Sequence, residues 1–349
     1  MIPTEGLDRF DYVRDLLGQP EALARTLRVL EVAPAPGQLA AEFSAGRFQR
    51  VVLTGMGASY HALHPLHLRL TALGVTSLRV DTSELIHCMP ALLEPGSLPI
   101  VVSQSGRSAE TLRLLELVEG RLPVVAVTNT PSSPLARSAA FAVITQAAEK
   151  SPVSSQTYTC SLAALEWLGA AMARADQPAL LAALNQTVAD VSEYLAGWKA
   201  HVDSLRGFLE GVTDLFLVGR GRSLAAANEG GLLLKESAHF PAEGIGCAAF
   251  RHGPLDMAGP GVLVCVFAGD PRTAPLNRGL VADVVRGGGR VAWIGEDADQ
   301  DAFRIPDRSP EGRSILEILP IQMISLALAA RSGHAPGIFA RLAKVTTVE

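Results

Sequence analysis

The sequence predicts an α/β protein in which one parallel-sheet unit is used twice along the chain. Short apolar segments at 51–54 and 215–218 each run into a glycine-containing turn. Further apolar segments follow each of them, and the equivalent segments of the two blocks are offset by roughly 160–170 residues. These segments are apolar throughout, and helical patterns separate them. This combination is typical of parallel sheets covered by helices on both faces.

The elements can be assigned in chain order. Residues 9–32 have apolar side chains at helical spacing, and Gly18 and Pro20 divide them into two short helices. A Pro- and Gly-containing linker at 34–37 follows. The first block then has apolar strands at 51–54, 100–102 and 124–127, and the second has them at 215–218, 262–266 and 291–294. A charged helical segment near 194–209 is the expected joint between the two domains.

Composition narrows the class of protein. Of the 349 residues, 48% are apolar and 19% charged, which indicates a globular protein rather than a disordered one. The net charge of −5 argues against a nucleic-acid partner. No run approaches the roughly 20 uninterrupted apolar residues of a membrane span, and residues 1–10 lack the apolar core of a secretion signal. We therefore expect a cytoplasmic protein that binds neither nucleic acid nor membrane.

The cysteines agree with a reducing compartment. All four are scattered, with no CxxC pair, and each lies among apolar or small neighbours (Cys88, Cys160, Cys247 and Cys265). Buried free thiols are the simplest interpretation.

Two loops have the chemistry of a phosphate site. The segment 103–108, Ser-Gln-Ser-Gly-Arg-Ser, follows a strand and precedes a predicted helix at 110–118. Hydroxyls, a glycine and free backbone N–H groups at a helix start can hold a phosphate dianion. Residues 57–59, Gly-Ala-Ser, stand at the end of the first strand in the same way. Ser and Gly are also common in ordinary turns and N-caps, so each loop alone leaves both interpretations open.

Other polar side chains also have two interpretations. Glu236 lies on a predicted helix at 228–238, where a carboxylate could equally be a surface group. His252 stands in a loop that ends in a Gly-Pro turn, and a single loop histidine is more often structural or solvated than catalytic. Histidines at 61, 64 and 67 are spaced by three residues, so on a helix they do not share one face. No carboxylate is placed to complete a metal site, so we expect no metal.

Several motifs together resemble those of the tandem sugar-isomerase (SIS) domain family, which includes the isomerase half of glutamine–fructose-6-phosphate aminotransferase and stand-alone glucosamine-6-phosphate deaminases. The matching segments run in order through nearly the whole chain: 19–21, 55–60, 103–106 with 110–112, 127–129, 149–159, 219–221, 229–230 with 234–236, 252–254 and 342–346. Ser-Gln-Ser-Gly, His-Gly-Pro and a lysine-bearing final tail are specific in combination.

The resemblance implies a fold and a domain division. It implies two tandem SIS domains, each a three-layer α/β/α unit with a mostly parallel, flavodoxin-like sheet. The expected boundaries are a helical leader at 1–34, SIS domain 1 at 35–192, and SIS domain 2 at 193–349 with a catalytic C-terminal tail.

The resemblance also implies roles for individual residues. The sugar phosphate would be held by Ser59, Ser103, Gln104, Ser105 and Ser108. Glu236 would move a proton between C1 and C2 of the open-chain sugar. His252 would assist ring opening by reaching into the site of a partner subunit, so we expect a homodimer with shared active sites. Lys344 would approach the sugar carbonyl from the tail and form a Schiff base where a family member uses one. No cofactor is implied.

Elementary chemistry agrees with these roles. Moving a carbonyl between C1 and C2 requires removal of the proton alpha to it, for which a carboxylate is suitable. A lysine can polarise the carbon as an imine if its pKa falls enough to leave a free amine. Composition alone would favour a frayed terminal residue for Lys344, and the matching tail motif favours a functional one.

Three functions remain open from the sequence. Residues 1–3 lead directly into the leader, without the N-terminal cysteine of a glutaminase half, so we expect a chain that lacks that half. The first hypothesis is an isomerase and deaminase of an amino-sugar phosphate, interconverting a glucosamine 6-phosphate-like compound with fructose 6-phosphate and ammonia. The second is a fructosamine-6-phosphate deglycase. The third is a non-catalytic sugar-phosphate-binding regulator, which would need an output element that a leader of roughly 35 residues is too short to provide.

Overall fold

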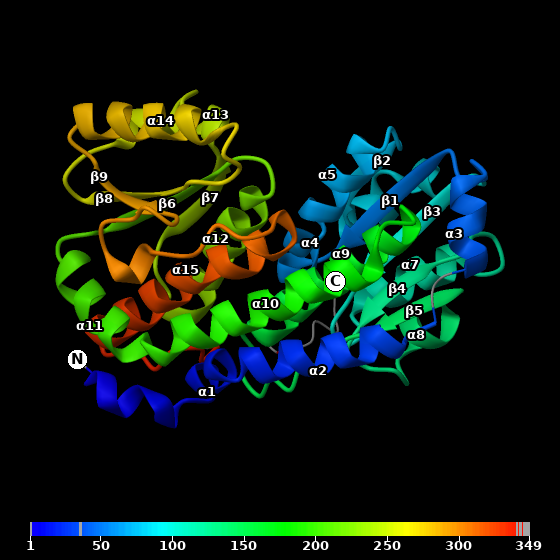
Figure 1. The fold of residues 1–349 in the computed structure, drawn as a ribbon, viewed down its shortest axis with the longest axis horizontal. Helices are drawn as coiled ribbons and strands as arrows, with labels where there is room; N and C mark the ends of the chain where they lie inside the picture. Colours follow the sequence, from blue (N-terminus) through cyan, green and yellow to red (C-terminus); the bar gives the residue numbers. More distant parts are fainter. Residues whose placement is uncertain (1, 35–36, 340, 342–343, 345–349) are drawn as a thin grey trace. The chain divides into compact units, whose positions relative to one another are not determined.

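The computed structural model describes residues 2–34, 37–339, 341 and 344 (Figure 1). By their contacts, residues group into two compact units. Unit 1 comprises Met1–Pro20, Glu149–Ser155 and Thr187–Arg341, and unit 2 comprises Glu21–Ala148, Gln156–Gln186 and Leu342–Glu349. The domains expected from the sequence are linear, whereas these units are discontinuous. The leader is divided between them, and the segment at 194–209, expected as the joint, lies wholly in unit 1.

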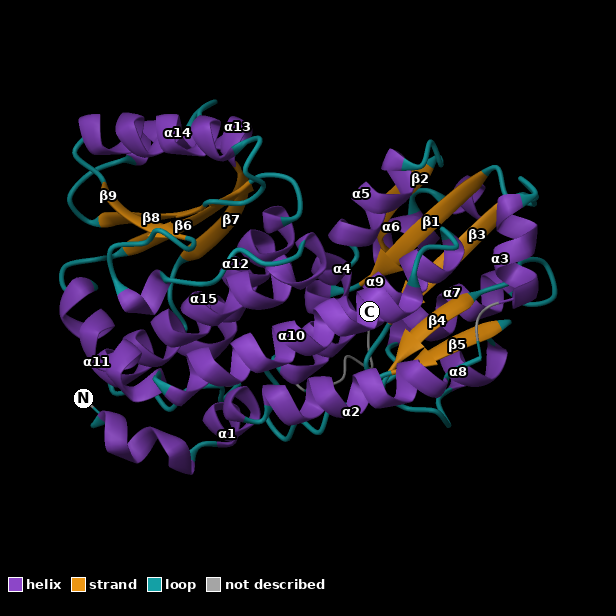
Figure 2. Cartoon of the chain, in the orientation of Figure 1, coloured by secondary structure: helices purple, strands orange, loops and turns teal. Residues whose placement is uncertain are grey.

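Unit 2 is built on a five-stranded parallel sheet with the strand order β2-β1-β3-β4-β5 (Figure 2). Its strands are β1 (Arg50–Gly55), β2 (Ser77–Asp81), β3 (Ser97–Val102), β4 (Val125–Thr128) and β5 (Phe141–Ile144). The three central strands are almost wholly buried, as their continuous apolar runs predict. The sequence did not reveal β2 and β5. Both are edge strands with partly exposed side chains; β2 includes polar residues, whereas β5 is apolar but only four residues long.

Helices cover both faces of this sheet. On one face α9 (Gln156–Met172) packs against α3 (Gly37–Ser44), α4 (Gly57–Ala62) and α5 (His64–Ala72). The other face carries α6 (Thr82–His87), α7 (Ala109–Val118) and α8 (Pro134–Ser138), whose apolar side chains form a core with those of β1, β3 and β4. A short connection, η2 (Pro90–Leu93), leads into β3. The predicted helix at 110–118 is confirmed by α7.

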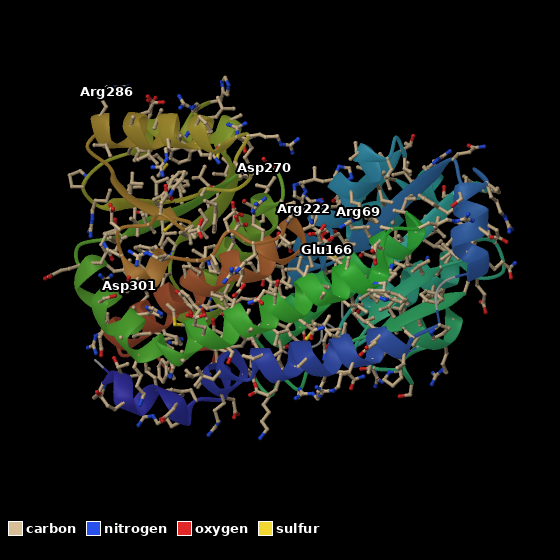
Figure 3. All side chains as sticks on the ribbon, viewed as in Figure 1. Arg69, Glu166, Arg222, Asp270, Arg286 and Asp301 are labelled. Carbon is tan, nitrogen blue, oxygen red and sulfur yellow. The ribbon has the colours of Figure 1, made fainter. Side chains whose placement is uncertain are left out.

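A buried ion pair joins two of these helices. Arg69 on α5 donates to the carboxylate of Glu166 on α9 across 2.7 Å (Figure 3). The Glu166 side chain is only 2% exposed. Removing one partner alone would leave the other charge buried and unpaired, which is strongly destabilising. The pair therefore favours the observed packing of α5 on α9.

Unit 1 contains a four-stranded parallel sheet with the order β7-β6-β8-β9. Its strands are β6 (Asp214–Gly219), β7 (Ala242–Gly246), β8 (Val262–Phe267) and β9 (Arg290–Ile294). The strands β1, β3 and β4 recur as β6, β8 and β9 at an offset of about 165 residues, which confirms the predicted repeat. The sequence did not reveal β7, another edge strand, whose residues include two glycines.

Helices again lie on both faces. The helices α13 (Cys247–Phe250) and α14 (Ala274–Arg286) form an apolar core with one face of the sheet, which includes Phe216 and Val218. On the other face, α12 (Ser223–Ala238) packs on β6 and β7, and α15 (Pro310–Ser332) packs on α12. Glycine permits this close approach, because a Cβ at Gly231 would lie 2.6 Å from the backbone nitrogen of Gly244. The predicted fold class, two units with parallel sheets between helical layers, is confirmed.

The remaining elements complete the chain. The leader forms η1 (Thr4–Arg9), α1 (Asp11–Leu17) and α2 (Gln19–Val32), so the predicted break near Gly18 is confirmed. Two helices, α10 (Gln177–Ala196) and α11 (Trp198–Phe208), precede β6. The short turns η3 (Pro254–Met257) and η4 (Asp301–Phe303) follow α13 and β9.

Two sequence expectations about burial can be compared with the structure. The helix α15 is apolar and long enough to cross a membrane, with a mean hydropathy of 1.4 over its best window, but 94% of that window is buried inside the fold. The burial of α15 as a core helix of unit 1 accounts for its apolar composition. Three of the four cysteines are buried as expected, whereas Cys88 is exposed because it lies just after α6, where the chain turns at the surface.

Candidate active site

The predicted phosphate loops meet at one place in unit 2. The sheet order reverses between β1 and β3, and ligands of open α/β sheets bind outside the carboxyl ends of the strands at such a point. Residue 59 follows β1, and the segment 103–108 follows β3. The paired positions Gly55 and Val102 end the two strands side by side. A Cβ on Gly55 would lie 2.9 Å from the Val102 carbonyl oxygen and 3.2 Å from the Cβ of Ser59, so the two loops are close neighbours.

The loop at 103–108, which we call the serine loop, is held by its own hydroxyls. Ser103 Oγ accepts a hydrogen bond from the Gly106 N–H at 3.2 Å, and Ser105 Oγ accepts one from the Arg107 N–H at 3.3 Å. Ser108 is the N-cap of α7, because its Oγ accepts from the Thr111 N–H at 3.4 Å. The loop therefore presents half-buried side chains beside the start of a ten-residue helix.

Residues 129–135, which follow β4, hold the serine loop in place. Gly106 has φ +60°, and a Cβ there would lie 2.3 Å from Ser133 Oγ, so only glycine fits this position. The Gln104 carbonyl accepts from the Asn129 N–H at 3.1 Å, and the Gly106 carbonyl accepts from the Leu135 N–H at 3.2 Å. Ser59, Ser103, Gln104, Ser105 and Ser108 are thus brought to one edge of the sheet in unit 2.

Glu236 lies in a different setting, on the last turns of α12 in unit 1. Its carboxyl is partly exposed. Burial and then the charge of Glu229 raise the pKa of Glu236 to about 8, while Lys235 lowers it in part. A carboxyl with this pKa exchanges its proton near neutral pH, which is the property that a general acid–base catalyst requires. Glu236 is therefore less exposed than a typical surface carboxylate, and its catalytic role stays a prediction.

The sequence did not predict which residues surround Glu236. Glu229 is seven residues earlier on α12, and such spacing places both carboxyls on one helix face. It is 1% exposed, and burial together with the charge of Glu149 raises its pKa well above the usual range. Tyr12 comes from the leader, where no sequence signal marked it. Its hydroxyl lies 3.0 Å from Ser325 Oγ, and burial, then the charges of Glu236 and Glu229, raise its pKa.

The segment 149–155 is anchored in the same unit. Glu149 Oε1 accepts from the backbone N–H and from the hydroxyl of Ser155, at 2.5 and 3.1 Å. Asp15 Oδ2 accepts from the N–H groups of Lys150 and Ser151, at 3.0 and 2.7 Å. The leader and this loop, more than a hundred residues apart in sequence, therefore build the surroundings of α12 together.

The segment that follows α15 contacts α12 at Gly337. Its N–H donates to the carbonyl of Ser237 at 3.0 Å, and its own carbonyl accepts from Ser151 Oγ at 3.4 Å. Gly337 has φ +74°, and a Cβ there would lie 2.4 Å from the Cβ of Tyr12. Lys344 follows this anchor by seven positions and is an exposed bend residue. The other residues of the tail motif, 342–343 and 345–346, lie outside the described residues.

His252 is not brought to Glu236 by the fold of a single unit. It is exposed and follows α13, which packs on the sheet face that includes Phe216 and Val218. The helix α12 packs on the opposite face, where a Cβ on Gly230 would lie 2.7 Å from Leu217 Cδ1. The backbone N–H of His252 donates to the Ala249 carbonyl at 2.9 Å, and the next residue, Gly253, has φ +135°.

Metal chemistry finds no support in the part of the chain that the structure describes. No group of three or more His, Cys, Asp or Glu side chains is arranged there to hold a metal ion. The rings of His64 and His67 lie 6.2 Å apart, and His67 Nδ1 is 3.1 Å from Ser77 Oγ.

Comparisons with known proteins agree with this architecture. The sequence profile of the SIS domain family matches residues 47–168 and 209–304. The glutamine–fructose-6-phosphate aminotransferase [isomerizing] of Pyrobaculum aerophilum is 30% identical over 97% of this chain and 57% of its own length. The chain thus spans little more than half the length of such curated relatives.

Two solved structures share the fold over nearly the whole chain. The C-terminal domain of glucosamine-fructose-6-phosphate aminotransferase from Francisella tularensis superposes with a TM-score of 0.80 at 20% identity, covering 94% of this chain and 98% of that one. A glucosamine-6-phosphate deaminase from Thermotoga maritima gives a TM-score of 0.78 at 16% identity, covering 97% and 100%. Because the profile covers more than half of the residues and includes both parallel sheets, this chain belongs to the SIS domain family.

Proposed function

We propose that this protein is an enzyme that isomerises and deaminates an amino-sugar phosphate, converting a glucosamine 6-phosphate-like compound into fructose 6-phosphate and ammonia. The observation that carries the proposal is the carboxyl of Glu236, whose pKa is raised to about 8 on a helix of an SIS-family unit. The names of the relatives support the substrate class, since they are aminotransferases and a deaminase of hexose 6-phosphates.

In this mechanism the serine loop and Ser59 hold the phosphate. The hydroxyls, and the N–H groups at the start of α7, would donate to the phosphate oxygens, and a helix N-terminus favours an anion. The hydrogen bonds within the loop fix its conformation before substrate arrives, so little ordering is needed on binding.

The proton moves through Glu236. In its ionised form the carboxylate removes the C2 proton of the open-chain amino aldose, and the same carboxyl returns the proton to C1. The 2-amino group then becomes a ketimine, to which water adds, and ammonia leaves as the C2 carbonyl of the ketose forms. Lys344 approaches the carbonyl carbon from the tail, and His252 of a partner subunit assists ring opening.

A substrate screen tests the proposed reaction. Glucosamine 6-phosphate, a fructosamine 6-phosphate and unphosphorylated glucosamine would each be incubated with the protein, and ammonia, released amine and fructose 6-phosphate measured. We expect ammonia and fructose 6-phosphate from glucosamine 6-phosphate alone. Amine release only from the fructosamine 6-phosphate would replace the proposal with a deglycase. Binding of these phosphates without any turnover would replace it with a sugar-phosphate regulator.

Phosphate holding is tested by removing two hydroxyls of the serine loop. We expect Ser103→Ala with Ser105→Ala to weaken binding of fructose 6-phosphate at least tenfold, because each hydrogen bond to a charged group contributes about 1.5–3 kcal/mol. Calorimetric titration measures this. The matched control is Ser132→Ala with Ser138→Ala, which removes two exposed serines of the same unit. Equal affinity of the test and control variants for fructose 6-phosphate would show that the phosphate does not bind at this loop.

The shared active site is tested by mixing chains. Because α12 and α13 lie on opposite faces of their sheet, we expect Glu236 to work with the His252 of a second copy. Sedimentation should show a homodimer. Glu236→Gln and His252→Ala chains, each inactive alone, should regain part of the activity when mixed and allowed to exchange, because one hybrid site is then intact. A monomer with full activity would contradict this arrangement.

A further inference from the structure

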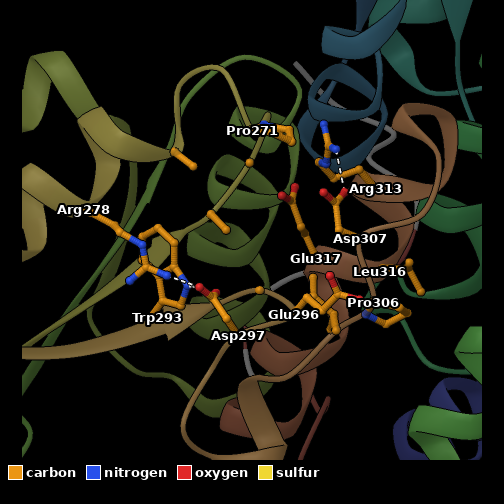
Figure 4. Close-up of a pocket in the computed structure, with 15 residues that line it drawn as sticks. Pro271, Arg278, Trp293, Glu296, Asp297, Pro306, Asp307, Arg313, Leu316 and Glu317 are labelled. Atoms are coloured by element: carbon orange, nitrogen blue, oxygen red, sulfur yellow. Dashed lines mark hydrogen bonds and ion pairs between the residues drawn. The ribbon is translucent and has the colours of Figure 1, made fainter.

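A cavity of about 280 Å³ lies in unit 1, apart from the residues assigned above. Its walls come from the turns after β8 and β9, from the start of α14 and from α15 (Figure 4). These turns stand at the carboxyl ends of the second sheet, where open α/β sheets bind ligands. Since β8 and β9 are the repeats of β3 and β4, the position corresponds to that of the serine loop in unit 2.

The cavity contains a buried carboxyl with one unsatisfied oxygen. Glu317 on α15 is 2% exposed and lines the cavity. Its Oε1 accepts a hydrogen bond from the Ser223 hydroxyl at 2.6 Å, while its Oε2 is buried and has no hydrogen-bond partner. Such an atom is rare in a native fold, because a buried polar atom without a hydrogen-bond partner is destabilising. In Figure 4 the carboxyl of Glu317 points into the space between Pro271 and Asp307.

The charges around Glu317 favour a cation. The lining residues include four carboxyls, those of Glu317, Glu296, Asp297 and Asp307, and two guanidinium groups. Both guanidinium groups are already paired: Arg313 donates to Asp307 at 2.7 Å, and Arg278 pairs with Asp297 while lying over the Trp293 ring. The lining therefore has an excess of carboxyls over cations. A metal ion is a poor fit, because no group of three ligating side chains occurs among the described residues.

We propose that this cavity, the Glu317 pocket, binds a small primary ammonium compound of about the size of one sugar ring. The ammonium group would donate to Glu317 Oε2, and the body of the ligand would lie against the apolar wall that includes Pro306 and Leu316. The volume of about 280 Å³ lies just below the usual range for small-molecule sites, about 300–1,000 Å³, so only a small ligand fits.

The titration behaviour of Glu317 agrees with this occupant. Burial raises the pKa of its carboxyl to about 8, with opposing contributions from the Ser223 hydrogen bond and Arg313 and a further rise from Asp307. Near neutral pH the group is mainly protonated in the empty pocket. An arriving ammonium stabilises the carboxylate, and the carboxyl then releases its proton to solvent.

The test uses the full chain and three probes at pH 7. Calorimetric titration with glucosamine should show binding, and glucose, which replaces the ammonium with a hydroxyl, should bind at least tenfold more weakly. Cyclohexylamine has the same ring size without hydroxyls. Tighter binding of glucosamine than of cyclohexylamine would identify an amino sugar as the ligand, and the reverse order would identify an apolar amine.

Variants locate the binding. Glu317→Gln keeps the side-chain volume and should lower the affinity for the amine at least tenfold, whereas Glu311→Gln, on the same helix but outside the pocket lining, should not. Ala274→Phe fills the pocket from α14 and should abolish binding of the amine. This variant carries the test if Glu317→Gln proves poorly folded. Binding that persists in both pocket variants, glucose binding equal to that of glucosamine, or no binding of either amine would overturn the proposal.

This inference is independent of the proposed reaction. Loss of amine binding in the Ser103→Ala, Ser105→Ala variant, with Glu317→Gln unaffected, would place the amine at the serine loop and would also overturn the pocket. Failure of the substrate screen, in contrast, would leave the Glu317 pocket untouched, because unphosphorylated probes report on it directly.

Discussion

Replacing Glu236 with glutamine is expected to lower kcat by about 10²–10⁴-fold on any amino-sugar phosphate that the wild type converts, the range typical of general acid–base catalysis. Glutamine has nearly the same shape but can neither accept nor return a proton. Affinity for the phosphate should change little, because the serine loop is intact. Steady-state kinetics separate the two effects. Glu243→Gln, which removes an exposed carboxylate from β7 in the same unit, is the matched control.

The pH profile gives this prediction a second readout. Since a base must be ionised and the pKa of Glu236 is raised to about 8, wild-type kcat/KM should rise by up to about tenfold per pH unit below pH 8 and level off above it. The cause of the raised pKa, burial and then the Glu229 charge, persists only while the fold around α12 is intact. A profile that is already flat from pH 6, or a Glu236→Gln variant with the activity of the control, would contradict the role of Glu236.

Lys344→Arg is expected to reduce turnover by orders of magnitude while leaving the melting temperature unchanged. A guanidinium stays protonated and cannot form an imine, so the positive charge is kept and the nucleophile is lost. Lys199→Arg makes the same exchange at an exposed lysine of α11. Near wild-type turnover of Lys344→Arg would show that Lys344 is not a nucleophile and that Glu236 acts without covalent help.

Deletion of residues 342–349 extends this test to the whole tail. Apart from Lys344, these residues lie outside the described part of the chain. The deletion begins beyond Gly337, whose contacts with Ser237 and Ser151 anchor the preceding segment. We therefore expect a nearly unchanged melting temperature in a thermal scan, together with a loss of turnover as large as that of Lys344→Arg. A large fall in melting temperature would assign the tail a structural role instead.

The fold was predictable to the extent that its strands are buried on both faces. The central strands β1, β3, β6 and β8 have apolar runs that need no knowledge of their neighbours. The edge strands β2 and β7 have no such runs, because their residues include polar side chains and glycines. Edge position alone does not decide the outcome, since β5 is apolar but short and was missed, whereas the apolar residues of the edge strand β9 were predicted as a strand. Cys88 shows the same limitation, since its apolar sequence neighbours do not reveal that the chain turns at the surface there.

By itself, the sequence determined the repeated parallel-sheet unit, the position of the serine loop after β3, and membership of the SIS family. These features depend on local patterns, namely apolar runs, turn residues and caps. Contacts between distant parts of the chain change such features little. Only the tertiary structure decided the environment of Glu236. Burial is the largest cause of the raised pKa of Glu236 and arises only on folding, and Tyr12 and Glu149, which interact with Glu236 and Glu229 respectively, come from distant parts of the chain. The unsatisfied oxygen of Glu317 arises in the same way, because the turns after β8 and β9 enclose it only once the sheet has formed.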